Sequence, residues 1–284
     1  MTNGPPRIFD RKALGLRRAR ASRMNGDPFL AAGAAEALKA RIAAVNRRFG
    51  AGLIVDTQGV EARILEGSAE SWRRLTLDDQ ENLPLDAERF DVAVSVLALH
   101  TVNDLPGVLR QIRAALNPDG LFVAALFGGD TLIELRHSLA LAEADISGGS
   151  SPRVAPFADI RALGGLLQRA GFALPVADVE RTVVLFRDFA TLIHDLRIHG
   201  QTNALEARSR KPLSRAALAA TVAHYGSNYS DPSGRLRATF DIVYLTGWSP
   251  HNSQQKPLLP GSGQIPLSSA VRAAVKSPDD SEIG

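Results

Sequence analysis

The chain has 284 residues, of which 45% are hydrophobic and 22% charged, as in a globular domain large enough to bury a core. Its formal net charge of +3 is too small to indicate a nucleic-acid-binding protein, and no apolar run is long enough to predict a transmembrane helix. The lack of cysteine excludes disulfides, thiolate metal sites and a cysteine nucleophile. It fits a reducing compartment, and we therefore expect a cytoplasmic protein.

The positive charge is concentrated near the N-terminus, where Asp10 is the one acid before residue 24. Such a segment can be a transit peptide or an arm that binds an acidic surface, but a solvent-exposed, partly helical lead-in is the simpler interpretation. We therefore treat residues 1–28 as a basic N-terminal arm. Its basic residues are Arg7, Arg11, Lys12, Arg17, Arg18, Arg20 and Arg23.

From residue 29 the hydrophobic pattern predicts helices and strands in alternation. Residues 29–48 have apolar side chains at helical spacing, and LIVD at 53–56 is a short buried strand. FDVAVSVLAL at 90–99 is apolar on both faces, as expected of a central parallel strand. Asn103 can cap the helix that follows it.

The second half continues the alternation. NPDG at 117–120 is typical of a turn, and LFVAALF at 121–127 is the next buried strand. Thr131 and Glu134 have the spacing of a capping box at the start of a helix. The later predicted elements are a helix at 158–170, a strand at 179–186, a mainly helical segment at 188–230 and a strand at 238–248.

This order predicts an α/β fold, a Rossmann-like doubly wound sheet that is mostly parallel, with FDVAVSVLAL and LFVAALF adjacent and central. The domain would span residues 29–248, with the helical insert at 188–230 covering the ligand edge of the sheet as a lid. Residues 249–284 are rich in Pro, Ser, Gly and Gln, which predicts a flexible tail.

Several stretches carry a family resemblance: IFDR at 8–11, VNDLP at 102–106, FGGDTLIELR at 127–136, GGSSPRVAPF at 148–157 and GWSPHNSQQKP at 247–257. With the segment from Phe90 to Phe127, they make the chain similar to class I S-adenosylmethionine-dependent methyltransferases, and more narrowly to the methyltransferase-like complex I assembly factors of mitochondria and alphaproteobacteria. The resemblance implies S-adenosylmethionine as cofactor, a protein partner or substrate such as a respiratory-complex subunit, and a place at the periphery of the inner membrane.

The loop after LIVD departs from the family pattern. In these methyltransferases it reads D-x-G-x-G-x-G, because the backbone must adopt positive φ and approach the cofactor closely. If Asp56 is the first residue of that motif, its glycine positions hold Gln58, Val60 and Ala62, and Gly59 is out of phase. We therefore predict a truncated loop with impaired cofactor binding.

The spacing to the next family element is also short. Asp79, in DDQENLP at 78–84, matches the acid that contacts adenine, and it follows Asp56 by 23 residues (79 − 56). Two helices and two strands need roughly 40 residues, so one strand–helix pair is missing. LIVD could be the first strand. Alternatively, it could be the second strand, with Asp56 holding the ribose and the first strand deleted.

Other candidate residues follow the predicted strands. His100 ends a strand at the edge where α/β sheets bind ligands, and either faces a cofactor or substrate or simply completes the strand through a hydrogen bond. Gly128, Gly129 and Asp130 form either a pocket loop or a tight turn. Arg153 is a candidate for anion or partner binding, and Trp248 for a partner surface or the core. No metal-ligand spacing is present.

Two functional hypotheses remain. In the first, the chain is an active S-adenosylmethionine-dependent methyltransferase or a related modifying enzyme, since the mitochondrial relatives resemble an arginine hydroxylase. In the second, it is a pseudoenzyme that keeps the methyltransferase fold and acts in the assembly of a complex I-like respiratory complex. The altered loop favours the second.

Overall fold

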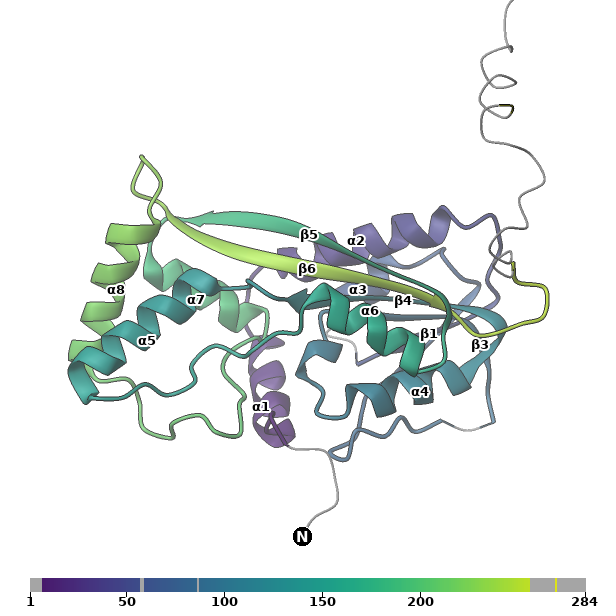
Figure 1. The fold of residues 1–284 in the computed structure, drawn as a ribbon, viewed down its shortest axis with the longest axis horizontal. Helices are drawn as coiled ribbons and strands as arrows, with labels where there is room; N and C mark the ends of the chain where they lie inside the picture. Colours follow the sequence, from purple (N-terminus) through teal and green to yellow (C-terminus); the bar gives the residue numbers. More distant parts are fainter. Residues whose placement is uncertain (1–6, 57–58, 86, 256–268, 270–284) are drawn as a thin grey trace, which may run out of the picture. The chain divides into compact units, whose positions relative to one another are not determined.

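The computed structural model describes residues 7–56, 59–85, 87–255 and 269. Within this part of the chain, six strands form one sheet in the order β2-β1-β3-β4-β6-β5 (Figure 1). Strands β1 to β4 are parallel, and β6 is antiparallel to both of its neighbours. The predicted doubly wound, mostly parallel sheet is therefore confirmed. The strands are β1 (Ala51–Val55), β2 (Ser71–Leu75), β3 (Phe90–Val96), β4 (Leu116–Gly128), β5 (Ala173–Phe186) and β6 (Leu236–Trp248).

Helices cover both faces of the sheet because side chains on its strands alternate between two apolar clusters. Ile54 and Val94 belong to the cluster under α2, α3 and α7, whereas Leu53 and Ala93 belong to the cluster under α4 and α6. Among the described helices, none is long and apolar enough to cross a membrane. They are α1 (Arg11–Ala21), α2 (Phe29–Ala43), α3 (Val60–Ile64), α4 (Leu105–Ala115), α5 (Ile133–Ser147), α6 (Ile160–Arg169), α7 (Phe189–Ile198) and α8 (Arg215–Tyr229), with a 3₁₀ turn at Leu99–Thr101.

The N-terminal half of the sheet is short, as its spacing predicts. Between Asp56 and Asp79 the described residues contain the five-residue helix α3 and the strand β2. Strand β1 lies between β2 and β3, which is the place of the first strand in a doubly wound sheet, where the chain reverses its direction of winding. LIVD therefore ends the first strand, and Asp56 stands at the switch point of the sheet.

Three local predictions are wrong: the turn at NPDG, the helix cap at Asn103 and the capping box of Thr131 and Glu134. In each case contacts with residues distant in sequence replace the expected local ones. NPDG is part of β4, where the pairing with β3 shifts register between Phe90 and Val92. Asp104, rather than Asn103, caps α4 by accepting from the N–H of Gly107.

The expected capping box is the third. Helix α5 begins at Ile133, and the hydroxyl of Thr131 donates to the carbonyl of Asp241 on β6. The buried carboxylate of Glu134 accepts from the N–H and hydroxyl of Thr239, also on β6. Thr131 and Glu134 therefore connect the start of α5 to β6 by hydrogen bonds, and do not form a capping box.

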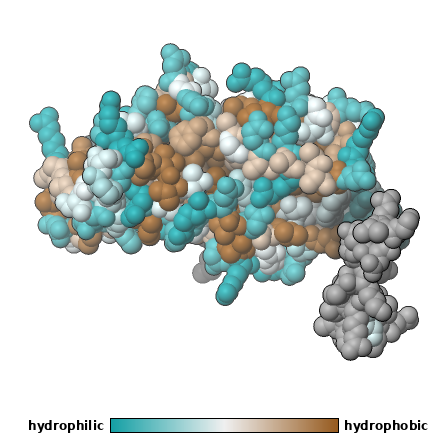
Figure 2. Space-filling model, turned by 90° about the horizontal axis from the view of Figure 1, so that it is seen from above, coloured by the Kyte–Doolittle hydropathy of each residue, from teal (hydrophilic) through white to brown (hydrophobic). Residues whose placement is uncertain are grey.

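Strand β5 is longer than predicted and forms an outer edge of the sheet. In the described part of the chain it pairs with β6 alone, although β6 is the later strand. Several of its apolar side chains are about half exposed, with Val176 at 56% and Val179 at 49%. Figure 2 views the molecule from above Figure 1, where β5 lies uppermost, and shows hydrophobic residues gathered across this face.

The other expected regions are only partly described. The segment 188–230 contains α7 and α8, joined by an irregular stretch at 199–214. Residues 251–255 contain a turn, and most of the expected flexible tail lies outside the described residues.

Candidate functional site

The carboxyl ends of β1 and β3 meet at an edge that α1 covers. Nη1 of Arg18 donates to Oδ2 of Asp56 at 2.7 Å, and Nη2 of Arg11 donates to the carbonyl of Leu77 at 3.3 Å. Ala13 and Leu14 of the same helix are buried. The interpretation of this segment as a solvent-exposed lead-in is therefore wrong: from Phe9 onward it is part of the domain.

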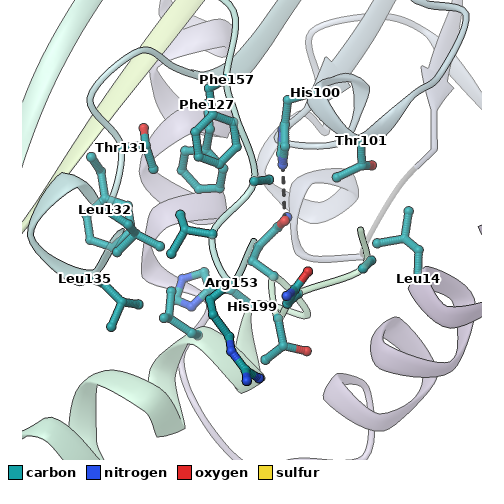
Figure 3. A pocket seen from close by; sticks show the side chains of 18 of the residues that line it. Leu14, His100, Thr101, Phe127, Thr131, Leu132, Leu135, Arg153, Phe157 and His199 are labelled. Carbon is teal, nitrogen blue, oxygen red and sulfur yellow. Dashed lines mark hydrogen bonds between the residues drawn. The ribbon is translucent and has the colours of Figure 1, made fainter. Parts of the chain in front are cut away.

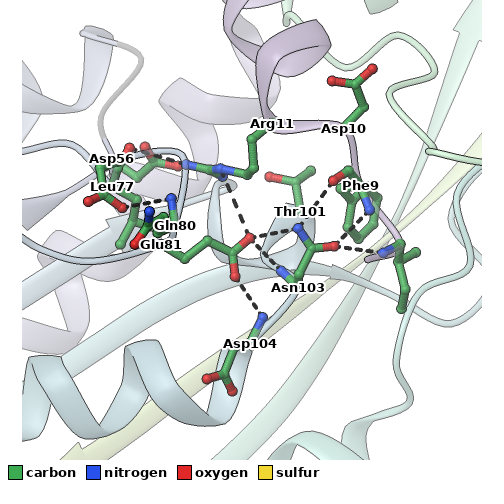
Figure 4. Close-up of polar contacts among 12 residues, drawn as sticks. Phe9, Asp10, Arg11, Asp56, Leu77, Gln80, Glu81, Thr101, Asn103 and Asp104 are labelled. Atoms are coloured by element: carbon green, nitrogen blue, oxygen red, sulfur yellow. Dashed lines mark hydrogen bonds and ion pairs between the residues drawn. The ribbon is translucent and has the colours of Figure 1, made fainter. Parts of the chain in front are cut away.

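A polar network holds the residues just before α1 (Figure 4). Oδ1 of Asn103 accepts from the N–H groups of Ile8 and Phe9 at 2.7 and 2.8 Å, and its Nδ2 donates to the carbonyl of Phe9. The buried carboxylate of Glu81 orients Asn103 by accepting from its N–H and its amide at 2.7 and 2.9 Å. Glu81 also accepts from the N–H of Asp104 at 2.7 Å. One carboxylate thus supports both the loop after β3 and the N-terminal segment.

Asp56 is fully buried and has a positive φ of 57°. Among the described residues, its Oδ1 has no hydrogen-bond partner, and neither have Nε and Nη2 of Arg18. The side chain of Arg18 is 17% exposed. The tip of β1 therefore holds a desolvated ion pair with a single hydrogen bond, where Asp56 binds a guanidinium group of its own chain.

Of the three other predicted cofactor contacts, His100 lines a cavity that Asp56, Gly59 and Asp79 do not line. Asp79 is exposed, and Glu81, two residues later, is the buried acid of this loop. Glu81 was not predicted as a functional residue, although the stretch DDQENLP contains both Asp79 and Glu81. Gly59 precedes α3 with φ 109°, and a Cβ there would meet nothing within 4 Å, so its backbone conformation explains the glycine.

A separate cavity of about 200 Å³ lies beside His100 (Figure 3). Neither Asp56 nor Asp79 lines it. Its apolar walls come from α1, α2, α5, α7, strands β4 and β6, and the loops before α5 and at 153–157: Leu14, Leu30, Phe127, Leu132, Leu135, Leu139, Val154, Phe157, Ile193, Leu196 and Phe240.

His100 lies at the predicted ligand edge, on the 3₁₀ turn after β3, and its ring contacts Phe127 and Phe157. Nε2 of Gln201 donates to the carbonyl of Leu97, which leaves its Oε1 as the atom that faces His100. This oxygen accepts from Nε2–H of His100 at 3.1 Å. Burial lowers the pKa of His100 to about 4, with the positive charge of Arg18 acting in the same direction and the hydrogen bond to Gln201 opposing it. His100 is therefore neutral at pH 7.

This neutral histidine makes stability depend on pH. The pKa of His100 is about 4 in the folded chain and 6.5 in the unfolded chain, so the unfolded state binds the extra proton between these values. We expect the free energy of unfolding to fall by about 2–3 kcal/mol as the pH drops from 6.5 to 4. Urea denaturation of His100→Gln should show a smaller loss over this range.

The matched control is His194→Gln, which removes an exposed histidine of α7 and should leave the pH dependence unchanged. His199 adds to the same slope, because burial lowers its pKa too. An equal pH dependence in His100→Gln and the wild type would contradict the assignment to His100.

The loop residues after β4 have structural partners. A Cβ on Gly128 would lie 2.5 Å from Cγ2 of Val243, so glycine allows β4 and β6 to pack closely, whereas Gly129 has more room. Asp130 is exposed, and its carboxylate pairs with Arg181 at 2.6 Å. Arg181 also binds Asp241 at 2.7 Å and holds the pKa of that carboxyl below its usual value. None of these three loop residues lines the cavity.

Of the two predicted partner-binding residues, Arg153 lies at the cavity and Trp248 does not. Arg153 lines the cavity, but its Nε and Nη2 both donate to Oε1 of Glu143, at 3.1 and 2.5 Å. Trp248 is half-buried against the core and pairs with Leu121 near the start of β4, so it lies far along the sheet from His100. No group of His, Cys, Asp and Glu among the described residues has a geometry that could hold a metal ion.

Relatives with known names support the fold and the resemblance. The mitochondrial arginine-hydroxylase NDUFAF5 of Danio rerio is 42% identical over 188 residues, 66% of this chain and 58% of the relative. A malonyl-[acyl-carrier protein] O-methyltransferase of Xylella fastidiosa is 35% identical over 181 residues, 63% of this chain and 59% of the relative. The chain thus spans a little over half the length of the curated relatives it matches.

The solved structures agree with the sequence matches. The crystal structure of the YcgJ protein from Bacillus subtilis matches with a TM-score of 0.50 at 10% identity, covering 76% of this chain and 98% of that one, which supports the fold alone. The model of a family described as "Methyltransferase domain" matches residues 33–175, about half of the chain. The sheet order, the first strand ending just before Asp56 and this match together show that the chain belongs to the methyltransferase domain family.

Proposed function

We propose that this protein is a methyltransferase-fold assembly factor that works without S-adenosylmethionine, by binding a protein subunit of a complex I-like respiratory complex. The observation that carries the proposal is the buried pair between Arg18 and Asp56. In a doubly wound sheet the tip of the first strand is where a nucleotide cofactor binds. Here α1 covers that tip and a guanidinium of the same chain takes the carboxylate.

The residues around Asp56 do not fit the cofactor well. Val60 and Ala62, at two of the family's glycine positions, already belong to α3. Each lost hydrogen bond to a charged group removes about 1.5–3 kcal/mol of binding free energy. Losing two would weaken binding by roughly 150-fold to 25,000-fold, at tenfold per 1.4 kcal/mol. A micromolar affinity would then become close to millimolar or weaker.

We therefore expect S-adenosylmethionine at about 1 mM to leave the melting temperature unchanged, since a ligand below its dissociation constant stabilises by less than RT ln 2. Differential scanning fluorimetry checks this directly. A clear upward shift at about 50 µM would contradict the proposal, because it requires a dissociation constant well below that concentration.

A second candidate is an enzyme that acts on an arginine side chain. The observation that favours it is again at Asp56, whose buried carboxylate already receives a guanidinium group. The relatives named arginine-hydroxylase are consistent with such a ligand. In this candidate, Arg18 occupies the place of a substrate arginine and must leave before the substrate enters.

One complementation experiment separates the two candidates. A double variant, Arg18→Met with Asp56→Leu, replaces the ion pair by apolar side chains and can keep the fold, since such replacements of buried pairs are often neutral or stabilising. In a host strain that lacks the gene and has lost complex I activity, this variant should restore activity if binding is sufficient. Loss of activity in the folded variant would favour the arginine-directed enzyme.

A further inference from the structure

The cavity beside His100 is separate from the edge at Asp56 that the proposed function concerns. Its walls come from α1, α2, α5, α7, the 3₁₀ turn after β3, strands β4 and β6, and the loops at 153–157 and 199–204 (Figure 3). The side chains of Leu135, Leu139 and Ile193 line it, together with the rings of Phe127 and Phe157. An apolar cavity of about 150 Å³ is large enough to hold a benzene ring. The volume here, about 200 Å³, leaves room for a somewhat larger apolar group.

Three of the four ring nitrogens of the cavity's two histidines have partners in the protein, whereas Nδ1 of His100 is buried and has no hydrogen-bond partner among the described residues. Nδ1 of His199 donates to the carbonyl of Asp195 at 2.7 Å, and its Nε2 accepts from the N–H of Leu30 at 3.2 Å. Nε2 of His100 donates to Gln201, whose own amide donates to a backbone carbonyl. Burial lowers the pKa of both imidazoles, so neither adds a positive charge at pH 7.

Three other polar side chains of the lining are engaged within the protein. Arg153 is paired with Glu143, and the hydroxyl of Thr101 donates to the carbonyl of Ala98. Both ends of the Asn203 amide are used, one by the carbonyl of Pro152 and the other by the N–H of Leu205. A charged ligand would therefore find no uncompensated opposite charge among these described residues, whereas an uncharged apolar group would replace water along the walls.

We infer that this cavity is a binding site for the uncharged alkyl chain of a small molecule, such as an acyl or isoprenoid chain. The apolar walls supply the affinity, and the neutral state of the polar rim selects against a charged group inside the cavity. Neither Arg18 nor Asp56 lines the cavity, so its test does not require S-adenosylmethionine.

Calorimetric titration of the full chain with a series of n-alkanols from butanol to octanol tests the inference. The dissociation constant should fall about fourfold for each added methylene until the cavity is full, from ~0.8 kcal/mol per buried methylene. Octanoate should bind at least tenfold more weakly than octanol, because its charge must be desolvated. N-acetyl-leucinamide, which represents an aliphatic side chain of a protein partner, should bind much more weakly than octanol.

Helix α5 offers a matched pair of variants. Leu139→Phe fills part of the cavity and should weaken octanol binding at least tenfold, whereas Leu141→Phe makes the same change at a side chain that is 50% exposed and outside the cavity. If Leu139→Phe does not fold, Ala155→Leu fills the cavity from the opposite loop. Unchanged affinity in the folded cavity variant, no octanol binding at all, or equal binding of N-acetyl-leucinamide would each overturn the inference.

Discussion

Arg18→Ala should lower the free energy of unfolding by about 3–5 kcal/mol, which is among the largest effects expected of a single substitution. The substitution leaves the carboxylate of Asp56 fully buried with no cation beside it. Urea denaturation monitored by circular dichroism measures the loss. The loss of stability comes from leaving a buried carboxylate without its counter-ion. It is therefore larger than the net contribution of the ion pair to the free energy of unfolding.

Two controls test this reasoning. Arg20→Ala removes an exposed arginine of the same helix and should change stability by no more than about 0.5 kcal/mol. The double variant Arg18→Met with Asp56→Leu removes both charges and should recover part of the stability, because leucine is strained at the positive φ of position 56. Equal losses in Arg18→Ala and Arg20→Ala would show that Asp56 does not depend on Arg18.

Glu81→Ala should be nearly as damaging, with an expected loss of about 3–4 kcal/mol. Its carboxylate accepts three hydrogen bonds from Asn103 and Asp104, at 2.7 to 2.9 Å, and the substitution leaves the backbone N–H groups of both residues without this acceptor. Because Asn103 in turn binds Ile8 and Phe9, the N-terminal segment should also loosen. Hydrogen exchange at Phe9 and in α1 should therefore increase more than at β4.

Asp79→Ala is the matched control two residues away. Asp79 is exposed, so its loss should change stability by less than about 0.5 kcal/mol. The pair also compares the acid that the family motif indicates with the acid that the fold uses. A large loss in Asp79→Ala, with little change in Glu81→Ala, would reverse the structural roles assigned to the two residues.

The parts of the fold that the sequence predicts well are those with strong local patterns. FDVAVSVLAL and LFVAALF are continuous apolar runs, and a strand buried on both faces requires such a run, so their central, adjacent positions follow. The missing strand–helix pair follows from chain length alone. Whether LIVD is the first or the second strand does not follow, because three apolar residues before an aspartate have the same pattern in either position.

The candidate site was harder to predict, since it depends on contacts between distant residues. Asn103 is a residue type that favours helix N-caps. Its side-chain oxygen instead accepts from the N–H groups of Ile8 and Phe9, about 95 residues away in sequence. Arg18 belongs to a run of basic residues that resembles any exposed helix, and nothing local marks it as the partner of Asp56. His100 was found because the end of a parallel strand is defined by the strand itself.

The position of β6 has a consequence for synthesis of the chain. This strand is the last of the six and lies between β4 and β5, so β5 lacks its neighbour until the ribosome has added about 60 further residues. At ~5–20 residues per second this interval lasts roughly 3–12 s. During that time a long strand with Val176, Val179 and Val183 has both edges open, which makes nascent chains stalled in this interval the species most prone to aggregate.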